Sequence, residues 1–168
     1  MPKIIENLQE RLIKEARRQI DESGYSSMTI RSVAAGCGVG VGTVYNYFQS
    51  KDELLAAYML EDWKKCIEAI RQVSERENHP EPVARAMYDQ LRLFARRNHS
   101  VFQDPAAAQG FTGSFNRYHG MLRSQLARQL RKFCTGEFEA EFVAEALLVW
   151  TMAQKSFGEI YSMVGKLF

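Results

Sequence analysis

Apolar residues recur along most of this chain at the three- to four-residue spacing that is typical of amphipathic helices. The first such segment covers residues 4–22 and ends at Ser23-Gly24, where glycine is a common residue just beyond the last helical turn. A second segment begins at Lys51 and carries an apolar stripe from Leu54 to Val73 with no helix-breaking residue. It predicts a helix of about 25 residues, which would be about 35 Å long at 1.5 Å per residue.

Beyond residue 80 the same spacing predicts further helices over residues 83–99 and 115–133, and another from residue 137 onward. The pattern weakens around residues 104–113, where we expect a short helix flanked by loops, and a break near residues 155–158 precedes a last helix. No segment shows the strict alternation of a strand. The sequence therefore predicts an all-α protein with eight or nine helices.

Two short apolar patterns lie between the first two long helices, over residues 29–51. Their inward positions are Ile30, Val33, Ala34, Cys37, Val39, Val44, Tyr47 and Phe48. Gly38 separates them, at a position where a steep turn needs positive φ. Thr29 can cap the first short helix, and Ser50 with Glu53 can form a capping box for the next long one. This arrangement predicts a helix-turn-helix whose second helix, about residues 41–48, is offered to a DNA major groove.

The segments TIRSVAAGCGV and GTVYNYFQSKDELL, the latter passing directly into a long helix, resemble the DNA-binding domain of the TetR family of transcriptional regulators. The resemblance covers about the first 55 residues, and the remaining two thirds carries no motif that we can match. It implies a three-helix DNA-binding domain over residues 1–51 and a helical effector-binding and dimerisation domain over residues 52–168.

The resemblance also implies which residues meet DNA. The expected set is Thr29, Arg31, Val41, Gly42, Thr43, Tyr45, Asn46, Tyr47 and Lys51. Arg31 is the one side chain of this set that could make a bidentate contact with guanine. Gly40 and Gly42 remove side chains that could read bases, so phosphate contacts and DNA shape should matter more than direct readout. For Tyr45 and Tyr47, plain core packing remains the alternative to phosphate binding.

In the second domain, the resemblance implies a pocket for a small-molecule effector. Candidate lining residues are Trp63, Phe94, Phe102, Phe111, Phe115, Tyr118 and Met121, although each could simply fill the core. Residues 85–132 carry nine Lys/Arg against two Asp/Glu, so their arginines are either solvated or paired, or they favour an anionic effector. No further cofactor is expected.

A single recognition helix gives too little contact for selectivity, so we expect a homodimer on a palindromic operator. The candidate interface is the last two helices, with Phe142, Leu147, Trp150, Phe157, Tyr161, Met163 and Val164. Burial of these residues within one subunit is the alternative.

Composition argues against several other classes of protein. Three widely separated cysteines argue against a disulfide framework, and the charged N-terminus and the absence of an 18-residue apolar run predict a cytoplasmic protein without a membrane span. Isolated histidines offer no metal-ligand spacing, and no nucleophile motif supports an enzyme. The function expected is therefore a ligand-responsive DNA-binding regulator, most simply a repressor. The alternative is a helical ligand- or protein-binding module without sequence-specific DNA binding, favoured by a net charge of only +2 over residues 1–51, where seven Lys/Arg face five Asp/Glu.

Overall fold

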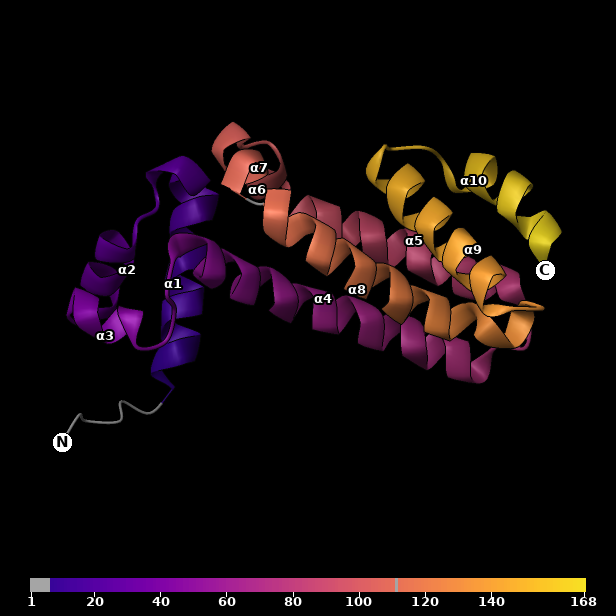
Figure 1. Ribbon diagram of the computed structural model, residues 1–168, viewed down its shortest axis with the longest axis horizontal. Helices are drawn as coiled ribbons and strands as arrows, with labels where there is room; N and C mark the ends of the chain where they lie inside the picture. The colour runs from indigo at the N-terminus through magenta and orange to yellow at the C-terminus, as the bar shows by residue number, and fades with distance from the viewer. Residues whose placement is uncertain (1–6, 111) are drawn as a thin grey trace. The chain divides into compact units, whose positions relative to one another are not determined.

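The computed structural model describes residues 7–110 and 112–168, and over those residues the chain is helical with no strand (Figure 1). Its helices are α1 Leu8–Ser23, α2 Ile30–Cys37, α3 Val41–Tyr45, α4 Lys51–Arg76, α5 Pro80–Arg97, α6 His99–Phe102, α7 Pro105–Gly110, α8 Thr112–Leu130, α9 Glu137–Met152 and α10 Phe157–Val164. The described residues also form three short 3-10 helices, η1 Tyr25–Ser27, η2 Arg131–Phe133 and η3 Gly165–Leu167. The all-α prediction is confirmed.

The described helices number ten, slightly above the eight or nine predicted. The additional element is α6. The sequence predicts one helix over residues 83–99, but α5 ends at Arg97 and Asn98 leaves helical geometry, with φ −106° and ψ 19°. Asn98 is fully buried, so packing fixes a break that apolar spacing alone does not reveal.

Contacts divide the chain into two compact units. Unit 1 comprises the described residues of Met1–Glu61 and Asn98–Thr112, and unit 2 comprises Asp62–Arg97 and Gly113–Phe168. Helix α4 thus contributes its first part to unit 1 and its remainder to unit 2. The functional division at residues 51 and 52 stays a prediction, whereas the compact units add residues 98–112 to the N-terminal helices.

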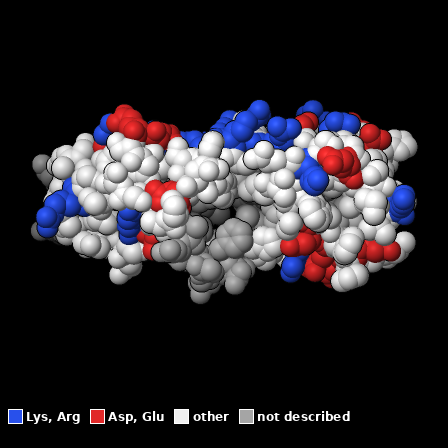
Figure 2. Space-filling view, turned by 90° about the horizontal axis from the view of Figure 1, so that it is seen from above, with Lys and Arg blue, Asp and Glu red and all other residues white. Residues whose placement is uncertain are grey.

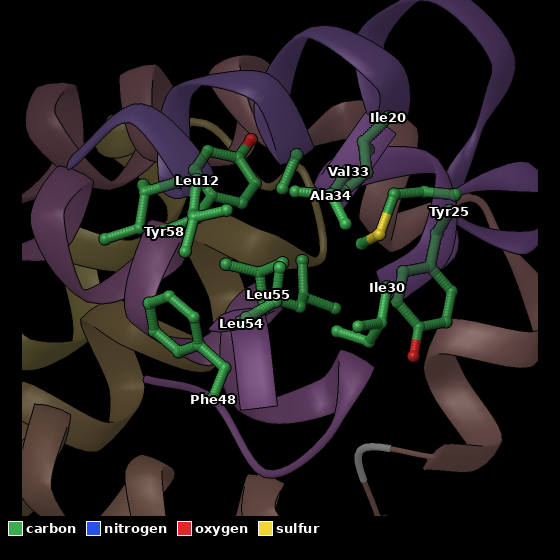
Figure 3. Packing of buried hydrophobic residues seen from close by; sticks show 14 of the residues in the cluster. Leu12, Ile20, Tyr25, Ile30, Val33, Ala34, Phe48, Leu54, Leu55 and Tyr58 are labelled. Atoms are coloured by element: carbon green, nitrogen blue, oxygen red, sulfur yellow. The ribbon is translucent and has the colours of Figure 1, made fainter. Parts of the chain in front are cut away.

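Unit 1 closes around one apolar core, seen from close by in Figure 3. Leu12 of α1, Val33 of α2 and Leu54 of α4 are all fully buried there. Fully burying a leucine or valine side chain contributes about 1.5–3 kcal/mol, so this cluster accounts for much of the unit's stability. Val101 of α6 and Ala107 of α7 belong to the same cluster, which is why residues 98–112 join the N-terminal helices.

Unit 2 is built around the packing of α5 against α9, with α10 against both. The inward face of α5 includes Val83, Met87 and Leu91, each fully buried. A polar contact fixes the end of α4, because Lys132 donates to the backbone carbonyls of Ser74 and Glu77 at 2.5 and 2.6 Å. These carbonyls lie in or just after the last turn of the helix, where a cation is favourable.

Candidate nucleic-acid interface

Helix α2 starts at a reciprocal cap. The Thr29 hydroxyl accepts a hydrogen bond from the Ser32 N–H at 2.9 Å, and the Ser32 hydroxyl accepts one from the Thr29 N–H at 3.0 Å. Two backbone donors that the first turn would leave unpaired are thereby satisfied. Thr29 is exposed but committed to this cap, so its predicted DNA contact would have to share the hydroxyl.

The turn between α2 and α3 depends on Gly38, which has φ +67° and ψ 33°. Its N–H donates to the carbonyl of Ala35, and the N–H of Val39 donates to Ala34, which together form a Schellman motif. Arg11 of α1 donates to the Cys37 carbonyl at 2.8 Å and holds this end of α2 from outside. The bend that the sequence predicted at Gly38 is therefore present.

Helix α3 is shorter than the predicted residues 41–48, because regular helix ends at Tyr45. The chain continues in a turn to Phe48, whose N–H still donates to the Val44 carbonyl at 3.0 Å. Val44 and Phe48 are buried and anchor this segment, whereas Tyr45 and Tyr47 are 47% and 36% exposed. Because only Val44 and Phe48 anchor the segment, both tyrosines lie outside the core and can contact a partner.

The other predicted DNA contacts on α2 and α3 are on the surface to different degrees. Arg31, Gly42 and Asn46 are exposed, while Val41 and Thr43 are half-buried. An added Cβ at Gly42 would meet no other heavy atom within 4 Å among the described residues. The fold itself therefore gives no steric reason for a glycine at this position.

Lys51 has a more enclosed setting than the sequence suggested. Its ammonium lies 3.9 Å from the centre of the Tyr25 ring and donates to the Ser26 carbonyl at 3.5 Å. Burial lowers the pKa of Lys51, and the nearby carboxylates of Asp104 and Asp52 oppose that shift. The Tyr25 hydroxyl in turn donates to Asp52. Lys51 is therefore held in place against η1 and is not a freely moving surface lysine.

The predicted effector-binding residues are only partly brought together. Trp63 and Phe94 are buried in unit 2 with their rings edge to face at 5.6 Å, and Trp63 donates its indole N–H to Gln125 at 2.5 Å. Tyr118 and Met121 are half-buried on α8 of the same unit. Phe102 is 41% exposed and belongs to unit 1. The side chains of Phe111 and Phe115 lie outside the described residues. Gln125 is a polar partner that no motif indicated.

An open hollow of about 540 Å³ lies elsewhere on unit 2, between the start of α5 and α10. It is lined by His79, Pro80, Glu81, Pro82, Arg85 and Tyr161, none of which is a predicted effector-binding residue.

The arginines of the basic region divide into two groups. Arg85 lies over the Phe157 ring at 4.0 Å, and Arg123 lies 3.9 Å from Glu145. Arg92, Arg96 and Arg97 of α5 are exposed, with no carboxylate within 4.0 Å among the described residues. Figure 2 shows a group of Lys and Arg atoms lying close together on one face. Both interpretations of this region, solvated arginines or an anionic effector, stay open predictions.

Helix α9 is apolar on two faces. Val143, Ala144 and Leu147 are buried within unit 2, but Phe142 and Trp150 are 53% and 50% exposed. A helix that is apolar all round is normally covered on all sides. Among the other predicted interface residues, Leu147, Phe157 and Val164 are buried inside the chain, Tyr161 is half-buried and Met163 is 68% exposed. Phe138, 78% exposed, belongs to the same outer face and was not among the predicted residues.

The described part of the chain lacks two further kinds of feature. No helix there is both long and apolar enough to cross a bilayer. The same residues contain no group of three or more His, Cys, Asp or Glu side chains that could hold a metal ion.

The N-terminal region is similar in sequence to known bacterial regulatory proteins. Residues 12–58 match the family described as bacterial regulatory proteins, tetR family. The HTH-type transcriptional regulator UidR of Escherichia coli K12 is 29% identical over 65 residues, which are 39% of this chain and 33% of UidR. The regulator HbdR of Aromatoleum sp. strain CIB is 35% identical over 54 residues, 32% of this chain and 24% of HbdR. The matched stretch thus spans a third or less of these relatives.

Solved structures are similar over nearly the whole chain. The TetR family repressor AlkX from Dietzia sp. strain DQ12-45-1b superposes with a TM-score of 0.68 at 16% identity, covering 94% of this chain and 97% of AlkX. FadR of Thermus thermophilus, a repressor solved in complex with lauroyl-CoA, has a TM-score of 0.66 at 18% identity, covering 95% and 92%. At such identities the likeness shows the fold. The match of residues 12–58 shows that this N-terminal stretch is similar to the tetR family of bacterial regulatory proteins.

Proposed function

We propose that this protein is a transcriptional regulator that binds a palindromic double-stranded DNA operator as a homodimer and is released from it by a small-molecule effector. The observation that carries the proposal is the α2-turn-α3 unit. Gly38 bends the chain, Val44 and Phe48 anchor its second half, and Tyr45 and Tyr47 face outward. These residues lie inside the stretch that matches the family.

Within the DNA contact, the exposed Arg31 is the residue that reads a base edge, since a guanidinium can donate two hydrogen bonds to guanine. The phosphates of the DNA backbone are bound by Thr43, Tyr45, Asn46, Tyr47 and Lys51. Long-range attraction between residues 1–51 and DNA should be modest. Their net charge is only +2, and Arg18 is already paired with Glu15 and Glu22 at 2.6 and 2.5 Å. Contacts that fix orientation, together with DNA shape, then supply more of the affinity than long-range attraction.

Pairing of two copies uses the outer face of α9 with α10. Phe138 and Phe142 lie 6.4 Å apart between ring centres on this face, and Trp150 follows two turns further along. A second copy is the occupant that fits, because a two-fold axis lets one apolar face cover an identical one. Pairing also supplies the second recognition helix, with half-sites about 34 Å apart or a multiple of that distance.

The effector site belongs to unit 2, beside the buried Trp63 and Phe94. Apolar and aromatic walls with one or two polar groups are the usual composition of a small-molecule site, and Gln125 and Tyr118 could supply the polar groups. The complex of Thermus thermophilus FadR with lauroyl-CoA offers one precedent for ligand binding on this fold.

An electrophoretic mobility assay on the DNA flanking the protein's own gene tests the proposal. Wild-type protein should retard a specific fragment, and the band should weaken steeply between low and moderate salt. Arg31→Ala should lose discrimination between specific and unrelated fragments, whereas Arg71→Ala, on the part of α4 in unit 2, should behave as wild type. Absence of any retarded band would favour a helical ligand- or protein-binding module instead.

A further inference from the structure

Asp104 lies 78 positions after Ser26 in the sequence, yet its carboxylate accepts hydrogen bonds from both the backbone N–H and the hydroxyl of Ser26 at 2.9 Å. The same carboxylate accepts from the N–H groups of Ala106 and Ala107 at 2.9 and 3.3 Å and so caps the start of α7. Pro105 stands at the first helical position, where its missing N–H costs nothing. One side chain thus joins η1 to α7 within unit 1.

The consequence reaches Lys51 through Ser26. The Ser26 N–H and hydroxyl are held by Asp104, which fixes the peptide plane on one side of this residue, and the Ser26 carbonyl accepts from the Lys51 ammonium at 3.5 Å. The Tyr25 ring covers another side of that ammonium at 3.9 Å. An ammonium has three N–H donors, so one can still be directed at an external acceptor.

We propose that Asp104 is a positioning residue for DNA binding, which acts through Ser26 to hold Lys51 in the orientation that meets a backbone phosphate. The inference rests on the proposed function, because it needs Lys51 at the DNA surface. Asp104 lies outside the family-matched residues 12–58, so this role does not follow from the match. Hydrogen bonds from Ser26 and the α7 backbone lower the pKa of Asp104, which keeps it an acceptor near neutral pH.

The direction in which DNA affinity changes when Asp104 is removed distinguishes a positioning role from a purely electrostatic one. Asp104 carries a negative charge, so its removal should tighten binding to anionic DNA if Coulomb repulsion were its only influence. Positioning predicts the opposite. Asp104→Ala should weaken operator affinity about tenfold, the cost of losing one charge-assisted hydrogen bond. Affinity should also depend less steeply on salt. The negative slope of log affinity against log salt should become shallower by about 0.9 for each phosphate that the protein no longer neutralises.

The experiment measures operator affinity at several salt concentrations for Asp104→Ala, Asp104→Asn, Lys51→Ala and the double variant Asp104→Ala/Lys51→Ala. Asp104→Asn retains one acceptor for Ser26 and should fall between wild type and Asp104→Ala. In the Lys51→Ala background, Asp104→Ala should weaken binding no further, because the two residues act on the same phosphate. Asp21→Asn removes an exposed carboxylate of the same unit that contacts Arg17 instead, and should not weaken binding.

Far-UV circular dichroism and thermal midpoints accompany each measurement, so that unfolding is not mistaken for a misplaced lysine. Equal or tighter binding by a folded Asp104→Ala, or additive losses of affinity in the double variant, would overturn the inference while leaving the DNA-binding proposal intact. Failure of the wild-type protein to bind the operator would count instead against the proposed function.

Discussion

The indole N–H of Trp63 on α4 donates to the side-chain oxygen of Gln125 on α8 at 2.5 Å, between residues 62 positions apart. Trp63 is only 2% exposed, so this donor has no ready access to water. An unpaired buried donor costs about 1–3 kcal/mol. The contact therefore stabilises unit 2 and fixes the orientation of the ring that we assign to the effector site.

Gln125→Leu should consequently lower the free energy of unfolding by about 1–3 kcal/mol, because the leucine cannot accept the indole N–H. Urea unfolding followed by tryptophan fluorescence measures this change. The double variant Trp63→Phe/Gln125→Leu removes both partners, and its destabilisation should be smaller than the sum of the two single effects. Strict additivity would show that the hydrogen bond contributes nothing.

Gly42→Ala separates stability from DNA binding. Gly42 is in α3, and alanine is preferred over glycine inside a helix by about 0.5–1 kcal/mol. An added Cβ meets no heavy atom of the described chain within 4 Å, so the thermal midpoint should rise. Operator affinity should fall, since the extra methyl group stands where we place the DNA. Gly120→Ala on α8, which is equally unobstructed, is the matched control and should raise stability with unchanged DNA binding.

The side-chain contacts of Glu15 should make the stability of unit 1 depend on pH in the acid range. Hydrogen bonds from Arg18 and Gln19 lower the pKa of Glu15 from 4.5 to about 2, against the opposing effect of burial. A carboxyl group whose pKa is depressed by folding stabilises the folded state above its unfolded pKa and loses that contribution as protons bind. The contribution should therefore be complete above pH 4.5 and disappear between pH 4.5 and about 2.

The isosteric variant Glu15→Gln should lack this contribution. Its free energy of unfolding should lie below that of the wild type at neutral pH, and the two curves should converge as the pH falls through that window. Unfolding by urea at a series of pH values gives both curves. A constant difference at every pH would contradict the expectation.

The outer face of α9 can be tested by charge. Trp150→Glu places a carboxylate on the surface that we expect a second copy to cover, and burying an unpaired charge is strongly unfavourable. Sedimentation equilibrium should show dimers for the wild type and monomers for this variant. Phe102→Glu is the control, because Phe102 is an exposed aromatic residue that belongs to unit 1 and not to α9 or α10. A wild-type protein that stays monomeric at high concentration would exclude this mode of pairing.

Local chemistry was readable from the sequence because its causes lie within a few residues of one another. The cap at Thr29, the positive φ of Gly38 and the start of α4 after Ser50 all depend on neighbours up to four positions away. Apolar spacing likewise identified the buried Val44 and Phe48, but it was wrong in placing Tyr47 on the inward face, because that side chain is 36% exposed. These features were sufficient to predict the helix-turn-helix and the all-α class.

The tertiary structure decided what spacing cannot encode. Helix α9 has apolar residues on both faces, so only its packing on α5 shows that Leu147 points inward while Phe142 and Trp150 stay outside. The contact of Lys51 with the Ser26 carbonyl joins residues 25 positions apart, and the hydrogen bond that the Ser26 N–H donates to Asp104 joins residues 78 positions apart. Contacts over such separations depend on how elements fold back on one another, because a local pattern fixes the face of a helix but not its neighbour.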